Sequence, residues 1–315
     1  MKITRFLAIG LMLTGLVLNG CLNTDDPAAD LPSIATLIAE NGELTQLERA
    51  LEITNLTTVL DETGGATIFA PNDFAFAEFV ARQGFNSMDE IPVDVLRNVL
   101  LYHVFSGKAD IVTIGTGYYQ TNNTEGPNET TIVSLIIRRN DETRLNEEAT
   151  VIVEDIEGRN GYVHIVNKVL TPPTLAEIFA ANDAFEIFKE GINRINRPDL
   201  LESDRPITLF APPDEAFEDF FENNATYSNI GEIPLDKLED LILHHFIGEF
   251  KTGTDLTDDV VGGAALYTTF AGDSLFITGP TRNLTVDNRA IFISVNITGT
   301  NGVAHFIDKV LDANF

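Results

Sequence analysis

The sequence predicts an α+β fold built from two tandem copies of one domain. Residues 67–79 read TIFAPNDFAFAEF and residues 208–220 read TLFAPPDEAFEDF, and eight of these thirteen positions are identical. Two further blocks recur in the same order: IPVDVLRNVLLYH (91–103) as IPLDKLEDLILHH (233–245), and NGYVHIVNKVL (160–170) as NGVAHFIDKVL (301–311). Three ordered blocks at a near-constant spacing indicate a duplication. Within each copy, helical patterns precede strand patterns, which is typical of the α+β class.

The length of the chain fits this division, because 315 residues correspond to about two domains of ordinary size. Residues 171–174 read TPPT, and two successive prolines can continue neither a helix nor a central strand. We therefore place the joint there. We expect domain 1 at residues 31–171 and domain 2 at residues 173–315.

The first repeated block predicts a strand, a turn and a helix. Residues 67–70 form a short apolar run of buried-strand character, and a proline ends it. Asn72 then offers a side-chain cap and Asp73 a negative charge, as the start of a helix prefers. In the second copy Pro213 replaces the asparagine, which loses the side-chain cap but suits a first helical turn, and Asp214 keeps the charge.

The second block predicts a helix with one buried face. Apolar residues at i, i+3 and i+4 form a stripe that ends on a histidine at i+7. In the first copy these residues are Leu96, Val99, Leu100 and His103. In the second copy they are Leu238, Leu241, Ile242 and His245.

The third block predicts a β-hairpin. An Asn-Gly turn signal follows a strand-like run in both copies, at residues 149–156 and 290–297. His164 and His305 stand third after the glycine, in the returning strand. Helical patterns open the copies at 31–51 and 174–192, and further strand-like runs lie at 130–138 and 273–279.

The N-terminus has the pattern of a lipoprotein signal peptide over residues 1–20. A basic start is followed by a 13-residue apolar segment (6–18), which is too short to span a bilayer. It ends at LNGC, which resembles a bacterial lipobox, so we expect Cys21 to carry a lipid anchor. Cys21 is the only cysteine, so no intrachain disulfide is possible.

Residues 21–30 are polar and contain proline, as suits a tether. Asp25 and Asp26 resemble the acidic export signals of some lipoproteins of the Bacteroidota. The resemblance implies an outer-membrane lipoprotein of a Gram-negative cell, exposed at the cell surface. The lipid anchor is the only membrane contact that we expect.

The chain carries 48 acidic and 20 basic side chains, a formal net charge of −28. Such a chain repels phosphate backbones, which argues against nucleic acid as a partner. We interpret the charge as solubility outside a cell, with divalent-cation binding on acidic loops as the alternative. Asp255, Asp258 and Asp259 are the best calcium candidates, but their spacing differs from that of an EF-hand loop, so a solvated loop is preferred.

No residue pattern predicts catalysis. The five histidines (His103, His164, His244, His245 and His305) lack the HExxH or paired CxxC spacing of metal ligands. Their places on apolar stripes and strand faces favour a structural role. The chain has no GxSxG elbow of a serine hydrolase and no GxGxxG loop of a nucleotide site. It has no tryptophan that could stack on a sugar. Tyr118, Tyr119 and Tyr267 could stack in this way, but we interpret them as ordinary strand residues. We expect no metal, no cofactor and no enzymatic activity.

The three blocks FAPND.AF, I-P…Tyr102-His103 and NG..H…KVL together resemble the fasciclin domain family. The resemblance covers both copies, from about residue 31 to the end. It implies a β-sheet wedge packed with a bundle of short helices, in a protein of the extracellular space that is often tandem and membrane-anchored. It also makes Asp73, Asp214, His164, His245 and His305 structural residues of the family motifs.

The family resemblance implies adhesion by weak contacts with an extracellular protein or polysaccharide. The Tyr-His pair has been tied to integrin binding in animal members, and it reads His244-His245 in the second copy. Tyr102 and His103 are therefore the candidate contact. Because His103 points inward on the helical pattern, we expect Tyr102 to be the exposed member. The alternatives are an accessory role in handling surface polysaccharide and a structural spacer in the envelope.

Overall fold

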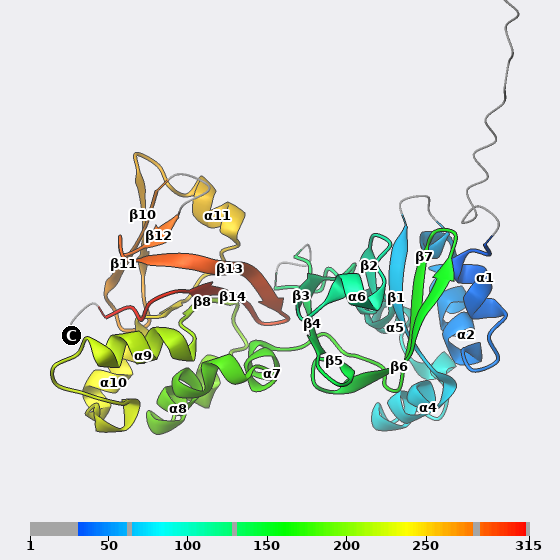
Figure 1. The fold of residues 1–315 in the computed structure, drawn as a ribbon, viewed down its shortest axis with the longest axis horizontal. Helices are drawn as coiled ribbons and strands as arrows, with labels where there is room; N and C mark the ends of the chain where they lie inside the picture. Colours follow the sequence, from blue (N-terminus) through cyan, green and yellow to red (C-terminus); the bar gives the residue numbers. More distant parts are fainter. Residues whose placement is uncertain (1–30, 62–64, 128–130, 280–283, 313–315) are drawn as a thin grey trace, which may run out of the picture.

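The computed structural model describes residues 31–61, 65–127, 131–279 and 284–312, which form two similar domains in sequence order (Figure 1). The predicted signal peptide, Cys21 and the tether lie outside the described residues. In each domain a seven-stranded sheet packs against short helices, so the α+β class and the tandem arrangement are confirmed. Within the described ranges, no helix is both long and apolar enough to cross a membrane.

Domain 1 opens with helices and continues into its sheet. The helices are α1 (Ile34–Ala39), α2 (Thr45–Ile53), α3 (Thr57–Leu60), α4 (Asp73–Arg82), α5 (Val93–Tyr102) and α6 (Ile111–Ile114), with a 3-10 turn η2 (Met88–Glu90). The strands are β1 (Ala66–Pro71), β2 (Val104–Ser106), β3 (Gly117–Gln120), β4 (Ser134–Arg139), β5 (Thr143–Leu145), β6 (Ala149–Gly158) and β7 (Gly161–Val166). Their order in the sheet is β2-β1-β7-β6-β5-β4-β3.

Domain 2 repeats this plan. Its helices are α7 (Leu175–Ala180), α8 (Glu186–Arg194), α9 (Asp214–Glu222), α10 (Leu235–Leu243) and α11 (Gly253–Asp258), with 3-10 turns η3 (Asp183–Phe185), η4 (Pro198–Leu200) and η5 (Ile230–Glu232). Its strands are β8 (Ile207–Ala211), β9 (Phe246–Ile247), β10 (Ala264–Thr268), β11 (Ser274–Thr278), β12 (Thr285–Val286), β13 (Ala290–Gly299) and β14 (Gly302–Ile307). The order β10-β11-β12-β13-β14-β8-β9 matches domain 1 strand for strand.

The strand of the first repeated block, β1, lies inside the sheet between β2 and β7. β1 pairs in parallel with β7, whereas its other neighbour β2 is antiparallel. Ile68 belongs to the apolar cluster on the helical side and Phe69 to a second cluster on the opposite side. Burial on both faces explains the continuous apolar run in the sequence.

The predicted hairpin is β6–β7 in domain 1 and β13–β14 in domain 2. The first residue of the returning strand must be glycine, Gly161 or Gly302, because β1 in domain 1 and β8 in domain 2 pass very close to it. A Cβ atom on Gly161 would lie 1.8 Å from the carbonyl oxygen of Ala66, and one on Gly302 would lie 2.7 Å from that of Ile207. No larger residue fits at either position without moving β1 or β8.

The predicted core stripes are buried as expected. Phe76 and Phe79 of α4 and the apolar stripes of α5 and α10 all lie in the domain cores. Asn72 caps α4 by accepting from the Ala75 N–H at 2.9 Å. Pro213 stands at the N-cap position of α9, one residue before the first turn in which the sequence pattern placed it.

Polar contacts of β4 join the two domains. The Ser134 Oγ accepts from the backbone N–H of Thr298 at 3.0 Å and donates to the carbonyl of Asn296 at 3.3 Å. The guanidinium of Arg138 contacts the Asp183 carboxylate at 2.9 Å and donates to the carbonyl of Ala181 at 2.8 Å. One edge of the domain 1 sheet therefore meets β13 and the α7–η3 turn of domain 2 (Figure 1).

Apolar contacts accompany these bonds. Ile136 of β4 belongs to the helical-side cluster of domain 2. The Tyr118 ring meets Phe306 edge-on at a centroid distance of 5.4 Å, and its hydroxyl bonds the side chain of Asn182. Tyr118 thus contacts the neighbouring domain and is not free to stack on a sugar.

Candidate functional site

The equivalent helices α5 and α10 are each followed by a buried histidine, His103 or His245. Its hydrogen bonds join the end of the helix to the segment that follows the last strand of the domain. The Nδ1 of His103 bonds the Val99 carbonyl at 2.7 Å, and its Nε2 accepts from the Leu170 N–H at 2.9 Å. In domain 2, His245 bonds the Leu241 carbonyl at 2.9 Å and accepts from the Leu311 N–H at 3.0 Å. Burial lowers the pKa of His103 to about 4 and that of His245 to about 3, so both rings are neutral at pH 7.

The hairpin histidines hold a bulge in the preceding strand. The backbone N–H of Asp155 donates to the Nδ1 of His164 at 3.1 Å, and that of Asn296 donates to the Nδ1 of His305 at 3.4 Å. Asp155 and Asn296 both have positive φ angles, 58° and 61°, where the register of β6 and β13 shifts. Burial lowers the pKa of His305 to about 4.

The motif aspartates connect two helices. The Asp73 carboxylate accepts from the Gln46 N–H at 2.8 Å and from the Thr45 hydroxyl at 2.7 Å, at the start of α2. The Asp214 carboxylate accepts from the backbone N–H of Ile187 at 2.8 Å, at the start of α8. Each aspartate therefore caps a neighbouring helix in addition to placing charge at the start of its own, which sequence reasoning missed.

The prediction that Tyr102 is exposed is wrong. Its side chain is 0% exposed and packs in the second apolar cluster of domain 1, with Leu135 and Ile137 of β4. Its hydroxyl donates to the Ser134 carbonyl at 2.8 Å and accepts from the Asn146 side chain at 2.9 Å. The end of α5 lies between two apolar clusters, so moving one residue around the helix still leads into the core. Neither Tyr102 nor His103 can touch a partner in this structure.

The acidic candidates for calcium do not converge. Asp255 forms a capping box with Thr252 at the start of α11. Asp259 accepts from the ammonium of Lys251 and from the hydroxyl of Tyr267, each at 2.7 Å. In the part of the chain that the structure describes, no three His, Cys, Asp or Glu side chains could hold a metal ion.

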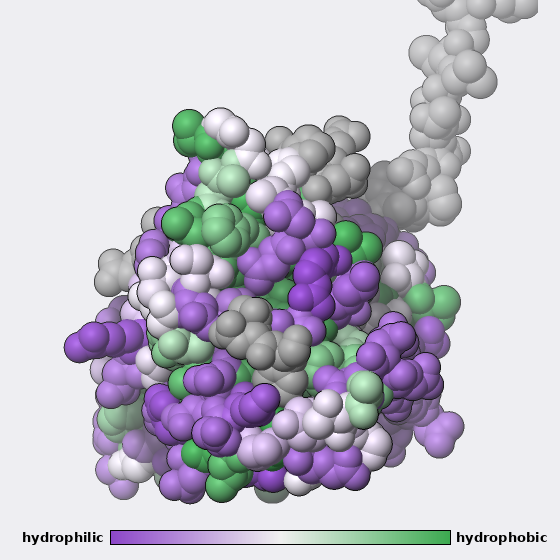
Figure 2. Space-filling view, turned by 90° about the vertical axis from the view of Figure 1, so that its left-hand side faces the viewer, coloured by the Kyte–Doolittle hydropathy of each residue, from purple (hydrophilic) through white to green (hydrophobic). Residues whose placement is uncertain are grey.

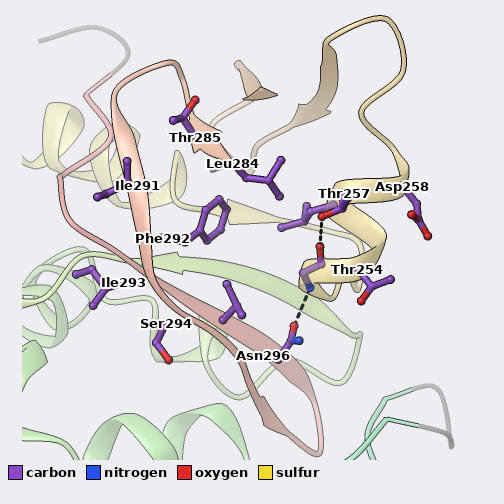
Figure 3. A pocket seen from close by; sticks show the side chains of 13 residues that line it. Thr254, Thr257, Asp258, Leu284, Thr285, Ile291, Phe292, Ile293, Ser294 and Asn296 are labelled. Carbon is purple, nitrogen blue, oxygen red and sulfur yellow. Dashed lines mark hydrogen bonds between the residues drawn. The ribbon is translucent and has the colours of Figure 1, made fainter. Parts of the chain in front are cut away.

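An open pocket of about 670 Å³ lies between α11 and β13 of domain 2 (Figure 3). Its walls carry Leu256, Leu284, Ile291, Phe292, Ile293 and Val295, and its polar groups come from Thr254, Thr257, Asp258, Thr285, Ser294 and Asn296. Figure 2 shows this end of the molecule, where apolar groups interrupt a largely hydrophilic surface toward the top of the view.

Some polar side chains of the pocket are hydrogen-bonded within the protein, and others are not. The Thr257 hydroxyl donates to the Gly253 carbonyl at 2.8 Å, and the Asn296 side chain accepts from the Gly253 N–H at 2.7 Å (Figure 3). Among the described residues, the side chains of Thr254, Asp258 and Ser294 form no hydrogen bond with one another or with the rest of the protein. The pocket combines an apolar wall with free polar groups, which suits binding.

The sequence pattern did not reveal this pocket. Residues 290–297 read AIFISVNI, in which Ser294 and Asn296 alternate with Ile293, Val295 and Ile297, and such alternation predicts that the apolar row is the buried one. Ile291, Ile293 and Val295 turn out to be the exposed row, and Ile293 is 58% exposed.

The two α+β domains share one strand order, and the motif histidines are buried in both, which defines the chain as a tandem pair of one domain type. The family model for the fasciclin domain matches residues 42–172 and again 183–313. The chain therefore belongs to the fasciclin domain family, and the resemblance seen in its motifs is confirmed.

Known proteins show the same relationship. The chain is 28% identical over 262 residues to the transforming growth factor-beta-induced protein ig-h3 of Sus scrofa, covering 80% of this chain but only 35% of that protein. It is 26% identical over 292 residues to a fasciclin-like arabinogalactan protein of Phaeosphaeria nodorum, covering 90% of this chain and 89% of that one. The solved FAS1 domain pair of the insect cell adhesion molecule fasciclin I has the same fold, with a TM-score of 0.56 at 20% identity over 86% of this chain and 97% of that one.

Proposed function

We propose that this protein is a surface-tethered adhesion protein that holds an extracellular protein or polysaccharide by weak contacts. The observation that carries the proposal is the exposed apolar row of β13 (Ile291, Ile293 and Val295) beside the free polar groups of its pocket. A contiguous apolar row that is exposed on a highly acidic chain and lines a pocket marks a contact region. The insect pair of the same fold comes from a cell adhesion molecule, which supports the proposal.

Binding without turnover is the function that suits this chemistry. Among the described lining residues of the pocket, no histidine or lysine accompanies the Thr254 and Ser294 hydroxyls, and no hydrogen bond joins either hydroxyl to the Asp258 carboxylate. The nearest motif histidine, His305, is fully buried and bonds the Lys251 carbonyl through its Nε2 at 2.9 Å. The tether, the lipid on Cys21 and an outer-membrane location exposed to the exterior complete the proposal.

The test uses immobilised extracellular-matrix proteins and polysaccharides as probes for the full chain. Ile293→Asp places a charge in the middle of the row, and we expect it to weaken binding by about tenfold, or ~1.4 kcal/mol. Leu235→Asp is the matched control, because Leu235 is 57% exposed at the start of α10, away from the pocket.

Each outcome of this panel decides between functions. Binding to a protein or a polysaccharide that Ile293→Asp weakens and Leu235→Asp preserves supports the proposal and identifies the partner class. Binding only to polysaccharide supports the accessory role in polysaccharide handling. The absence of binding to every probe contradicts the proposal and favours a structural spacer.

A further inference from the structure

The strand β4 has two sides with different tasks. Its outward side chains, Ser134, Ile136 and Arg138, face domain 2 and contact it. Its inward side chains, Leu135 and Ile137, lie in the second apolar cluster of domain 1. β4 pairs with β3 on one side and with β5 on the other, and β3 is the edge of the sheet.

Tyr102 contacts β4 from the core of domain 1. Its hydroxyl donates to the carbonyl oxygen of Ser134, the same residue whose Oγ bonds Asn296 and Thr298 in domain 2. The hydroxyl also accepts from the side-chain amide of Asn146. The carbonyl oxygen of that amide accepts from the backbone N–H of Ile136 at 3.0 Å. In addition to the strand pairing of β4 with β3, one buried hydroxyl therefore contacts two interface residues, Ser134 directly and Ile136 through Asn146.

The second copy provides an internal comparison. There the equivalent of Tyr102 is His244, which bonds Asp287 at 3.1 Å, and Asp287 stands where domain 1 has Asn146. Asp287 likewise accepts from the N–H of a β11 residue, Phe276. Phe276 corresponds to Ile136, yet it is 43% exposed, since among the described residues no side chains of the other domain pack on it as those of domain 2 pack on Ile136. The tyrosine and asparagine therefore occur in the copy whose strand carries a neighbouring domain.

We infer that Tyr102 is a positioning residue that sets the arrangement of the two domains by fixing β4 through Ser134 and Asn146. Tyr102 is buried in domain 1, so it would influence how the two domains are oriented without itself contacting domain 2 or a binding partner. This inference rests on contacts within the chain and does not depend on the proposed binding function.

The test measures the distance between the domains in the full chain. In a Cys21→Ser background, Ala81→Cys and Glu222→Cys place spin labels at equivalent exposed positions near the ends of α4 and α9. Tyr102→Phe keeps the ring and removes the hydroxyl. We expect a broader and shifted distribution of label distances by pulsed electron resonance, while circular dichroism shows that both domains remain folded.

Three further variants make the result decisive. Ser134→Ala removes the two bonds of the Ser134 Oγ to domain 2 and should broaden the distribution in the same way. Asn146→Asp removes the donor to the Tyr102 hydroxyl and serves as the second variant if Tyr102→Phe lowers the yield of folded protein. His244→Phe, the corresponding change in domain 2, should leave the distribution as in the wild type. A wild-type distribution in Tyr102→Phe and Asn146→Asp, together with a broadened one in Ser134→Ala, would overturn the inference.

Discussion

At the scale of single residues, the motif side chains act by satisfying backbone groups inside the fold. His103 and His245 join the end of a helix to the backbone at Leu170 and Leu311, and Asp73 caps a helix other than its own. A buried donor or acceptor that loses its partner costs about 1–3 kcal/mol. The family motif thus marks positions where two elements share a hydrogen bond.

The buried histidines make stability depend on pH. Their folded pKa values, about 4 for His103 and His305 and about 3 for His245, lie below the value of about 6.5 of an unfolded histidine. The unfolded chain therefore binds protons first, so their stabilising effect is complete above pH 6.5 and is lost as the pH falls toward 4.

We expect the melting temperature to fall steadily from pH 7 to pH 4. His103→Gln should be less stable than the wild type at pH 7, because its contacts to Val99 and Leu170 are disturbed, but should lose less stability on acidification. Thermal melts at several pH values give both quantities. Parallel pH profiles for the two proteins would show that His103 does not titrate as its burial requires.

At the scale of the elements, short helices depend on caps supplied from elsewhere. α2 has no side-chain cap from its own N-cap residue, Leu44, and α8 has none from Phe185. The carboxylates of Asp73 and Asp214 take that place from the start of the next long helix. A helix of nine residues is marginal in water by itself, so such contacts decide whether it forms.

We predict that Asp73→Ala lowers the free energy of unfolding by about 1 kcal/mol, the usual effect of losing a cap. Glu78→Ala is the control, because Glu78 lies on the same helix α4 and makes no side-chain hydrogen bond to the described residues. Urea denaturation of the two variants measures the difference. The capping role is refuted if they are equally stable.

At the scale of the whole molecule, the two domains form a defined pair. Polar bonds from β4 and the edge-on contact of Tyr118 with Phe306 fix one domain against the other. A surface protein gains avidity from two modules only if both can engage together, and a fixed pair presents its surfaces at a set spacing.

The proposed lipid anchor on Cys21 would determine where this pair acts. We predict that metabolic labelling with a fatty acid marks the wild type and that Cys21→Ser is unlabelled and absent from the lipoprotein fraction, because acylation of this residue supplies the anchor. Asn23→Ser, two residues along the tether, should remain labelled. A wild type without label would rule out the anchor.

The sequence by itself determined the duplication, the α+β class, the family and the buried stripes. These features are local or periodic: the spacing of Leu96, Val99 and His103 reports one helix face, and an Asn-Gly pair reports a hairpin wherever the chain runs. Repetition strengthened each of them, since the same pattern appeared twice.

Only the tertiary structure decided which surfaces remain open. Tyr102 looked exposed because a helical pattern reveals one buried face, whereas the end of α5 is enclosed by a second cluster made of strands distant in sequence. Ile136 and Phe276 occupy equivalent positions, yet one is buried and the other exposed, because within the described residues Ile136 packs against the neighbouring domain and Phe276 does not. Exposure depends on what else packs nearby, and that is a property of the assembled chain that no local pattern contains.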